Sequence, residues 1–248
     1  MNSNAADFRV GVVAPVECLK EGWELIKDQY WLFLGICFIG MLIGSAFAIV
    51  LMGPMMCGIF LCLFQRQRRQ PVEFATLFKG FDYFLQSLIV MLIKAIPMVV
   101  LMVPFYVIML AVMLTSAPRG ETNPAEGSRF VFAFVGFELV FMLVLMIVGI
   151  SIEIFFMFAF PLVVDRQLPG LEAIKLSIKA GKKNFSGVLG LLLLNAVFSS
   201  VGVLCCFVGV YFYLPISLAS YAVAYRRVFP EIPQILPTPP PPPESWAA

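Results

Sequence analysis

Four long apolar stretches, with only three charged side chains among them, dominate the sequence. They span residues 30–65, 83–114, 130–164 and 185–225. A helix needs about 20 apolar residues to cross the hydrocarbon core of a bilayer. The first and last stretches are therefore long enough for two crossings each. Each middle stretch suits one long, kinked or tilted crossing.

These stretches predict an all-α, polytopic membrane protein with six transmembrane helices arranged as three hairpins. The composition agrees, because 61% of the residues are hydrophobic and only 13% are charged, whereas about a quarter are charged in soluble domains. We expect residues 1–14 to be a flexible N-terminus and residues 15–230 to form the membrane domain. Residues 231–248 should be a disordered proline-rich tail.

Basic residues are divided unevenly between the segments that join these helices. One side has only Arg119 and Arg129, while Lys94 lies inside a span. Loops rich in Lys and Arg remain in the cytoplasm, so both termini are expected to be cytoplasmic. The remaining 14 of the 17 basic residues fall on that side: Arg9, Lys20, Lys27, Arg66, Arg68, Arg69, Lys79, Arg166, Lys175, Lys179, Lys182, Lys183, Arg226 and Arg227.

A similar unit begins three times, near residues 15, 71 and 169. Each copy starts with a proline (Pro15, Pro71 and Pro169), has an acidic residue two or three positions later, and continues with helical periodicity into a span. Proline is tolerated in the first turn of a helix. The pattern predicts three short amphipathic helices that lie in the cytoplasmic interface of the membrane.

The second helix of each predicted hairpin also contains a proline. These are Pro54, Pro161 and Pro215, and each is followed by a basic exit. We expect all three to kink their helices, with the freed carbonyl groups satisfied inside the bundle.

Small residues recur four positions apart in the first span, at Gly40, Gly44 and Ala48. Such a stripe lets two helices approach closely. It serves either packing within the chain or the interface of a homodimer.

Residues 53–81 and 160–177, with the segment near residue 15, resemble a group of bacterial proteins. These are uncharacterised six-helix integral membrane proteins, similar to the membrane domain that precedes some glycerophosphodiester phosphodiesterases. The resemblance covers roughly residues 15–230 and implies a location in the bacterial cytoplasmic (inner) membrane. It brings no catalytic residues to this chain, because a phosphodiesterase would need a separate soluble domain with metal ligands.

The three charged residues inside predicted spans are Lys94, Glu138 and Glu153. Lys94 lies 12 residues after Asp82, and Glu153 lies 12 residues before Asp165. Both should therefore lie about 18 Å from the cytoplasmic helix ends, at ~1.5 Å per residue. An ion pair between the third and fourth spans is expected. It serves either to set helix register or, together with Glu138, to form a proton or substrate path.

Four lysines in the third unit, Lys175, Lys179, Lys182 and Lys183, are candidates for contacts with lipid headgroups. The tail contains five consecutive prolines at residues 239–243, which form polyproline II. It is either a disordered tail or a docking peptide for a protein partner.

The sequence contains no histidine, no phosphate-binding loop and no nucleophile motif. We therefore expect no enzyme activity, no metal, no cofactor and no nucleic-acid binding. The preferred function is a scaffold or a factor in membrane or envelope organisation, with membrane lipids as partners. The alternative is a small transporter or permease that uses Glu138, Glu153 and Lys94.

Overall fold

The computed structural model describes residues 8–46, 50–115, 124–204 and 208–231, and this part of the chain is helical without any strand. The protein is thus an all-α, polytopic membrane protein, as the sequence predicts. The elements are α1 (Pro15–Ile26), η2 (Lys27–Gln29), α2 (Tyr30–Ala46), α3 (Met52–Gln67), η3 (Phe74–Tyr83), α4 (Phe84–Thr115), α5 (Pro124–Phe156), α6 (Ala159–Asp165), α7 (Gly170–Lys183), α8 (Phe185–Leu204) and α9 (Val208–Val228).

Within the described residues, five helical segments are long and apolar enough to cross a membrane, where the sequence predicts six. The predicted span that falls short is α3, which has 16 residues. At ~1.5 Å per residue it measures about 24 Å, less than the hydrocarbon thickness of about 30 Å. This helix is also buried along most of its length, so α3 forms the centre of the protein. The five segments are Pro15–Ala46, Phe74–Val112, Phe134–Asp165, Phe185–Leu204 and Val208–Val228.

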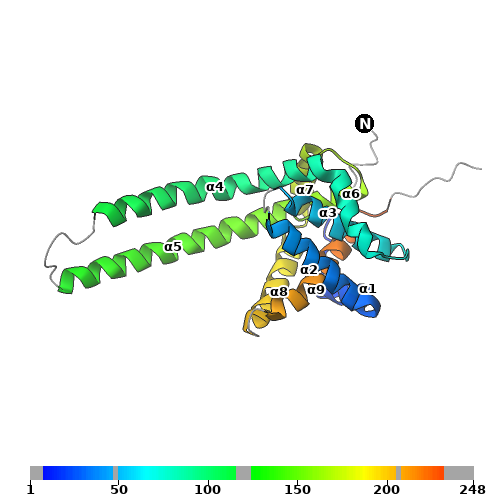
Figure 1. The fold of residues 1–248 in the computed structure, drawn as a ribbon, viewed down its shortest axis with the longest axis horizontal. Coiled ribbons are helices and arrows are strands. Elements are labelled where there is room, and N and C mark those ends of the chain that lie inside the picture. The colour runs from blue at the N-terminus through cyan, green and yellow to red at the C-terminus, as the bar shows by residue number, and fades with distance from the viewer. Residues whose placement is uncertain (1–7, 47–49, 116–123, 205–207, 232–248) are drawn as a thin grey trace, which may run out of the picture.

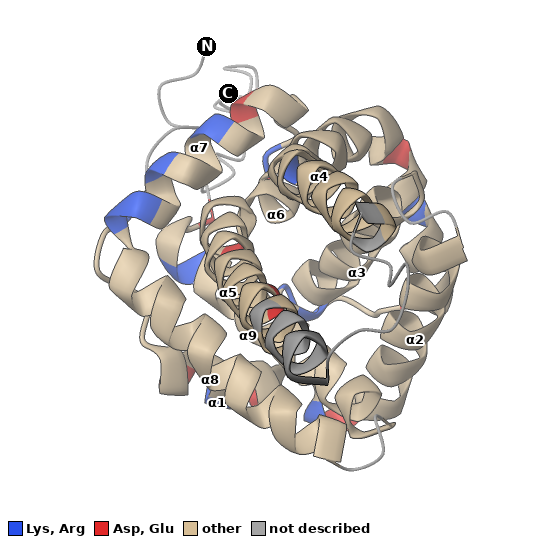
Figure 2. Cartoon of the chain, turned by 90° about the vertical axis from the view of Figure 1, so that its left-hand side faces the viewer, with Lys and Arg blue, Asp and Glu red and all other residues tan. Residues whose placement is uncertain are grey.

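The two longest helices form a hairpin that projects from the rest of the molecule (Figure 1). We call α4 and α5 the arm; α4 has 32 residues and α5 has 33. Seen from the free end of the arm, α4 and α5 lie near the middle of the view, and α7, α8 and α2 lie around them (Figure 2). Many side chains of the arm are apolar and exposed, as expected for helices surrounded by lipid.

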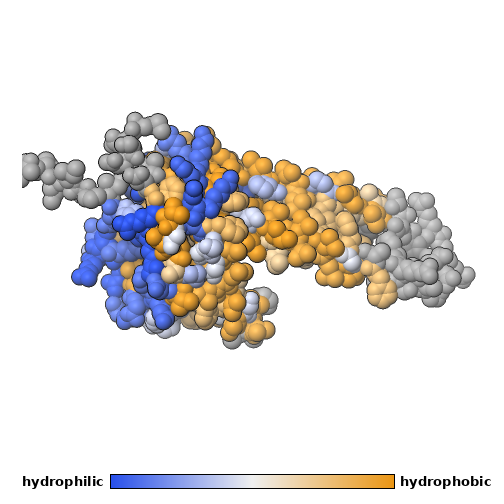
Figure 3. All heavy atoms as spheres, turned by 180° about the vertical axis from the view of Figure 1, so that it is seen from behind, coloured by the Kyte–Doolittle hydropathy of each residue, from blue (hydrophilic) through white to orange (hydrophobic). Residues whose placement is uncertain are grey.

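Hydrophilic residues gather at the end of the molecule opposite the tip of the arm (Figure 3). Apolar residues cover the arm in the same view. The uneven distribution of basic residues along the sequence thus corresponds to one polar end in the folded protein. One end of the protein is therefore polar, and the helices extend from it.

Two of the three predicted amphipathic segments are α-helices, α1 and α7, whereas the second, η3, is a 3-10 helix. A 3-10 helix has three residues per turn, so side chains three positions apart share one face. In η3 this face carries Leu77 and Gly80, both buried, and it lies directly on α3. A Cβ at Gly80 would lie 2.1 Å from Pro54 O. Contact between the two backbones therefore requires glycine here.

The three prolines of the hairpins have different roles in the structure. Pro54 lies in the first turn of α3, where proline is tolerated, so the predicted kink at Pro54 is wrong. Pro215 lies inside α9. Pro161 follows a break between α5 and α6. Near that break, the hydroxyl of Ser177 donates to Phe155 O at 2.6 Å, which satisfies a carbonyl inside the bundle.

Residues 8–14 are not the flexible segment that the sequence predicts, because they are bound to the body of the protein. The amide of Gly11 donates to Asn184 Oδ1 at 2.7 Å, and Asn184 Nδ2 donates to Arg9 O at 3.1 Å. Arg9 N donates to Val228 O at 2.8 Å. The side chain of Asn184, at the start of α8, thus holds the N-terminal segment against the end of α9. Residues 1–7 lie outside the described part.

The small residues of the first span pack within the chain. A Cβ at Gly40 would lie 3.1 Å from Ile59 Cδ1, and a Cβ at Gly44 would lie 2.9 Å from Met52 Sδ. Both neighbours belong to α3, so these two glycines allow α2 and α3 to approach each other. Ala48, the third member of the stripe, lies outside the described residues.

Candidate functional site

The ends of the three hairpins meet at the polar end of the molecule. Each contributes a charged residue: Arg68 follows α3, Asp165 ends α6 and Arg226 lies in the last turn of α9. These residues are up to 158 positions apart in sequence. Each lies at the end of a helix that returns to the polar end of the molecule. The repeated order of span, turn, span and basic exit brings them together.

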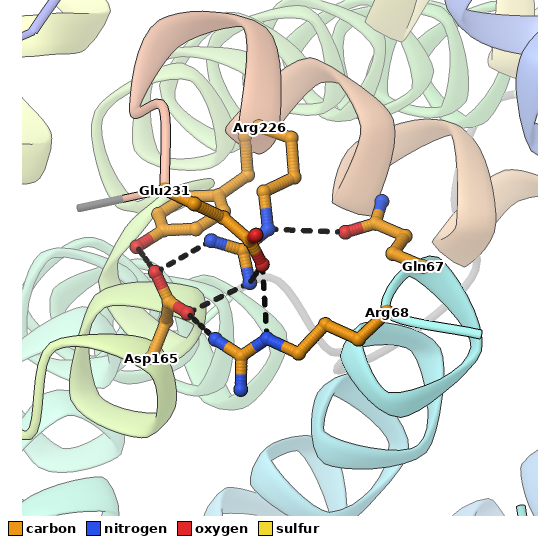
Figure 4. A network of polar contacts seen from close by, with 6 residues as sticks. Gln67, Arg68, Asp165, Arg226 and Glu231 are labelled. Carbon is orange, nitrogen blue, oxygen red and sulfur yellow. Dashed lines mark hydrogen bonds and ion pairs between the residues drawn. The ribbon is translucent and has the colours of Figure 1, made fainter. Parts of the chain in front are cut away.

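Asp165 is the centre of this arrangement (Figure 4). Arg226 donates from Nη1 to Asp165 Oδ2 at 2.9 Å and from Nη2 to Oδ1 at 2.7 Å, which is a bidentate pair. Arg68 Nη2 donates to Oδ1 at 3.0 Å, and the hydroxyl of Tyr225 donates to Oδ2 at 2.9 Å. The side chain of Asp165 is 7% exposed and that of Arg226 is 14% exposed. We call Asp165, Arg226, Arg68 and Tyr225, together with Glu231 and Gln67, the exit network.

A second carboxylate completes the charge balance of the exit network. Glu231 Oε1 accepts from Arg68 Nε at 2.9 Å and lies 3.3 Å from Arg226 Nη2. The hydrogen bond with Glu231 raises the pKa of the Arg68 guanidinium, so Arg68 stays charged. Arg226 Nε donates to Gln67 Oε1 at 3.2 Å, and its guanidinium lies 4.6 Å from the centroid of the Phe64 ring.

The chemistry of the exit network is that of a structural contact between helices and not that of a catalytic site. Two guanidinium groups face two carboxylates, so the formal charges cancel. Both oxygens of Asp165 accept hydrogen bonds from charged or hydroxyl donors, so this carboxylate is fully engaged within the network. The network therefore ties α3, α6 and α9 together.

A second set of ion pairs lies beside the exit network and holds α1 and η2. Arg227 donates to Glu17 Oε2 at 2.8 Å and to Glu21 Oε1 at 2.7 Å. Arg66 donates from Nη2 to Asp28 Oδ2 at 2.9 Å. An open cavity of about 580 Å³ lies beside these contacts, and its polar lining is Arg9, Glu21, Glu24, Gln67, Arg226 and Arg227.

The structure brings together two of the three charged residues that lie inside the predicted spans. Lys94 Nζ on α4 lies 2.6 Å from Glu153 Oε1 on α5. A cavity of about 480 Å³ opens beside the pair, between the two helices. Glu138 lies 15 positions from Glu153 on the same helix, about 22 Å along the axis, so it does not join the pair.

The Lys94–Glu153 pair lies next to the place where α7 packs against the arm. The amphipathic helix α7 crosses the base of the arm, where a Cβ at Gly181 would lie 2.6 Å from Ile154 O. At its other end, the amide of Gly170 donates to Gln86 Oε1 at 2.7 Å. Glu153 is thus adjacent in sequence to a residue that contacts α7. The expected depth of about 18 Å assumes that the interface lies at Asp82 and Asp165, whereas α7 lies further along the arm.

The four candidate headgroup lysines are on α7, and all four are exposed. They face away from the side that packs against the arm, which carries the buried residues Ala173, Ser177, Ala180 and Gly181. Blue stretches mark Lys and Arg along the α7 ribbon in Figure 2. Lys179 Nζ also lies 5.9 Å from the centroid of the Phe8 ring. These lysines are Lys175, Lys179, Lys182 and Lys183.

Sequence reasoning assigned Arg68 and Arg226 to the topology of the chain and did not pair them with Asp165. A signal was available: Asp165 is an acidic residue that directly precedes the basic exit of the second hairpin at Arg166. A carboxylate among such arginines is expected to lie at their meeting point. Within the described ranges, no group of three or more His, Cys, Asp or Glu residues is placed so that it could hold a metal ion.

We expect Lys94 and Glu153 to be energetically coupled. Lys94→Ala and Glu153→Ala should each lower the thermal stability of the protein in detergent, and the double variant should recover part of the loss. Contacting residues have coupling energies of about 0.5–3 kcal/mol. The side chains are 24% and 51% exposed, so the lower part of this range is expected. If the losses in the double variant simply add, the pair does not set the register of the arm.

Comparisons of the chain with protein-family models, with curated proteins and with solved structures found no match.

Proposed function

We propose that the protein is a non-enzymatic scaffold of the bacterial inner membrane that organises lipids of the cytoplasmic leaflet. The exit network is the observation that carries this proposal. It joins three hairpins through a charge-balanced set of contacts around Asp165. A body held together in this way presents its amphipathic helices in a fixed arrangement, with both termini in the cytoplasm.

The amphipathic helix α7 supplies the surface for anionic lipids. Its four lysines are exposed while its opposite side packs against the arm. Near a membrane surface, each lysine contributes about 1 kcal/mol of attraction to anionic lipid. The tail at 232–248 lies outside the described residues, and we propose that it docks a cytoplasmic protein partner. Gly40 and Gly44 pack within the chain. A homodimer would therefore have to form through other surfaces.

A transporter is the second candidate, and the cavity beside Lys94 and Glu153 favours it. A path would need further polar groups along the arm. Glu138 is about 22 Å from Glu153 along α5, and the aromatic residues Phe137 and Phe141 on either side of it stack on Phe105. These rings fill the contact between α4 and α5 near Glu138, which makes the scaffold the better supported function.

The full chain reconstituted in vesicles should distinguish the two candidates. We expect energy transfer from tryptophan to a labelled anionic lipid to exceed that to a labelled zwitterionic lipid. A luminal pH-sensitive dye should show the same proton leak as in protein-free vesicles. Replacing Lys175, Lys179, Lys182 and Lys183 with glutamine should remove the lipid preference.

The matched control is Lys20→Gln on α1, a single exposed lysine of the first amphipathic helix, which should change the lipid preference little. Equal energy transfer to both lipids in the wild type would contradict the scaffold proposal. A proton flux that disappears in Glu138→Gln or Glu153→Gln would establish the transporter in its place.

A further inference from the structure

The cavity at the base of the arm has the character of a ligand site. It lies between α4 and α5, measures about 480 Å³, and is lined by Met91, Ala95, Met98, Gly149 and Ile152 together with Lys94 and Glu153. Small-molecule sites are commonly clefts of about 300–1,000 Å³ with mostly apolar walls and a few polar groups. The only charged groups in this lining are one cation and one anion, and they lie side by side.

Lys94 and Glu153 have binding capacity beyond their own pair. The ion pair joins Nζ to Oε1, and an ammonium has three donors while a carboxylate has two acceptor oxygens. Among the described residues, neither group forms another ion pair. Tyr221 on α9 lies close enough to interact electrostatically with the Glu153 carboxylate. Charged groups at membrane depth are costly unless they are satisfied. A ligand with one anionic and one cationic group would satisfy both at once.

The level of the cavity fits the headgroup of a lipid. It lies beside the place where α7 crosses the arm, because Ile154, the neighbour of Glu153, contacts α7 at Gly181. From this level the arm continues as exposed apolar surface, which includes Val99 and Val103 on α4 and Met146 on α5. A headgroup in the cavity would therefore have its acyl chains along the arm.

We propose that this cavity binds a lipid whose headgroup carries both a phosphate and a primary ammonium, as in phosphatidylethanolamine. Lys94 donates to the phosphate, and Glu153 accepts from the ammonium. A headgroup whose only charge is the anionic phosphate, as in phosphatidylglycerol, offers Glu153 hydroxyl donors but no cationic partner. A quaternary ammonium lacks N–H donors, so phosphatidylcholine cannot form the charge-assisted hydrogen bond that a primary ammonium forms. This inference rests on the proposed role in lipid organisation. It adds a lipid with a primary ammonium to the anionic lipids proposed for α7.

The test is lipid retention by the full chain in detergent, measured by native mass spectrometry with equal amounts of phosphatidylethanolamine, phosphatidylglycerol and phosphatidylcholine. We expect phosphatidylethanolamine to be retained about tenfold over the other two, the ratio that one additional charge-assisted hydrogen bond provides. Glu153→Gln should reduce its retention to the level of phosphatidylcholine. Free phosphoethanolamine, added alone, should bind far more weakly than the lipid.

A second variant tests the cavity while both charges stay in place. Gly149 lines the cavity, and a Cβ there would lie 3.3 Å from the flexible Met98 Cε. Gly149→Leu should therefore fill the cavity and abolish the preference. Gly136→Leu is the matched control on the same helix, since a Cβ at Gly136 meets nothing within 4 Å, and it should leave the preference unchanged.

Equal retention of the three lipids by the wild type would overturn this site. So would a preference that survives both Glu153→Gln and Gly149→Leu. Binding of free phosphoethanolamine as tight as that of the lipid would replace the lipid site with a small-molecule site. Repeating the comparison in the variant with Lys175, Lys179, Lys182 and Lys183 replaced by glutamine removes anionic lipid held by α7. The enrichment of anionic lipid by α7 therefore tests the scaffold proposal separately.

Discussion

Replacing Asp165 with alanine is expected to destabilise the protein by about 3–5 kcal/mol. The substitution removes the carboxylate that accepts hydrogen bonds from Arg226, Arg68 and Tyr225. Arg226 is 14% exposed, so its guanidinium would lose the bidentate partner while remaining largely desolvated. Glu231 would remain as its only described carboxylate neighbour. The free energy of unfolding can be followed by titrating the purified protein in mild detergent with a denaturing one.

The exposed ion pairs around α1 provide the matched control. Glu17 accepts from Arg227, but its side chain is 65% exposed. Exposed pairs contribute about 0–1 kcal/mol, so Glu17→Ala should have a small effect. If Asp165→Ala is no more destabilising than Glu17→Ala, the exit network does not hold the three hairpins together. The main support for the scaffold proposal would then be lost.

Gly80→Ala is expected to prevent η3 from docking on α3. A Cβ at Gly80 would lie 2.1 Å from Pro54 O and 2.5 Å from Gly58 N. Both are backbone atoms near the centre of the protein, so the clash cannot be relieved by rotating a side chain. A loss above about 4 kcal/mol is expected for such a site. The variant should be recovered in low yield, and size-exclusion chromatography should show aggregated protein.

The control for Gly80→Ala is Gly136→Ala in α5. No atom lies within 4 Å of a Cβ at Gly136, and alanine favours a helix over glycine by about 1 kcal/mol. Gly136→Ala should therefore leave the stability unchanged or raise it slightly. A well-folded Gly80→Ala protein with wild-type stability would show that η3 does not approach α3 so closely in the membrane.

Much of the fold follows from the order of apolar and basic residues. The long stretches predict a helical membrane protein because every backbone N–H and C=O in lipid must be satisfied within the segment. The equal distances of Lys94 and Glu153 from the ends of their helices indicated that they would meet, since helical rise is uniform along a hairpin. Such inferences work because they depend only on lengths and on local periodicity.

Other features depend on which surfaces come into contact. Pro54 begins a helix instead of kinking one, because α3 starts later than the apolar stretch indicates. The second amphipathic unit is a 3-10 helix that lies directly on α3, where Gly58 and Gly80 allow two backbones to meet. The position of Glu153 beside α7 depends on how α7 packs across the arm, which is a tertiary contact.

By itself, the sequence determined the helical class, the polar end and the pairing of Lys94 with Glu153. Local hydrophobicity and helical rise are sufficient for these. The tertiary structure alone decided that α3 lies at the centre, that residues 8–14 are held by Asn184, and that Asp165 joins Arg68 and Arg226. Each of these depends on contacts between residues far apart in the chain. Only the folding of the three hairpins against one another brings such residues within hydrogen-bonding distance.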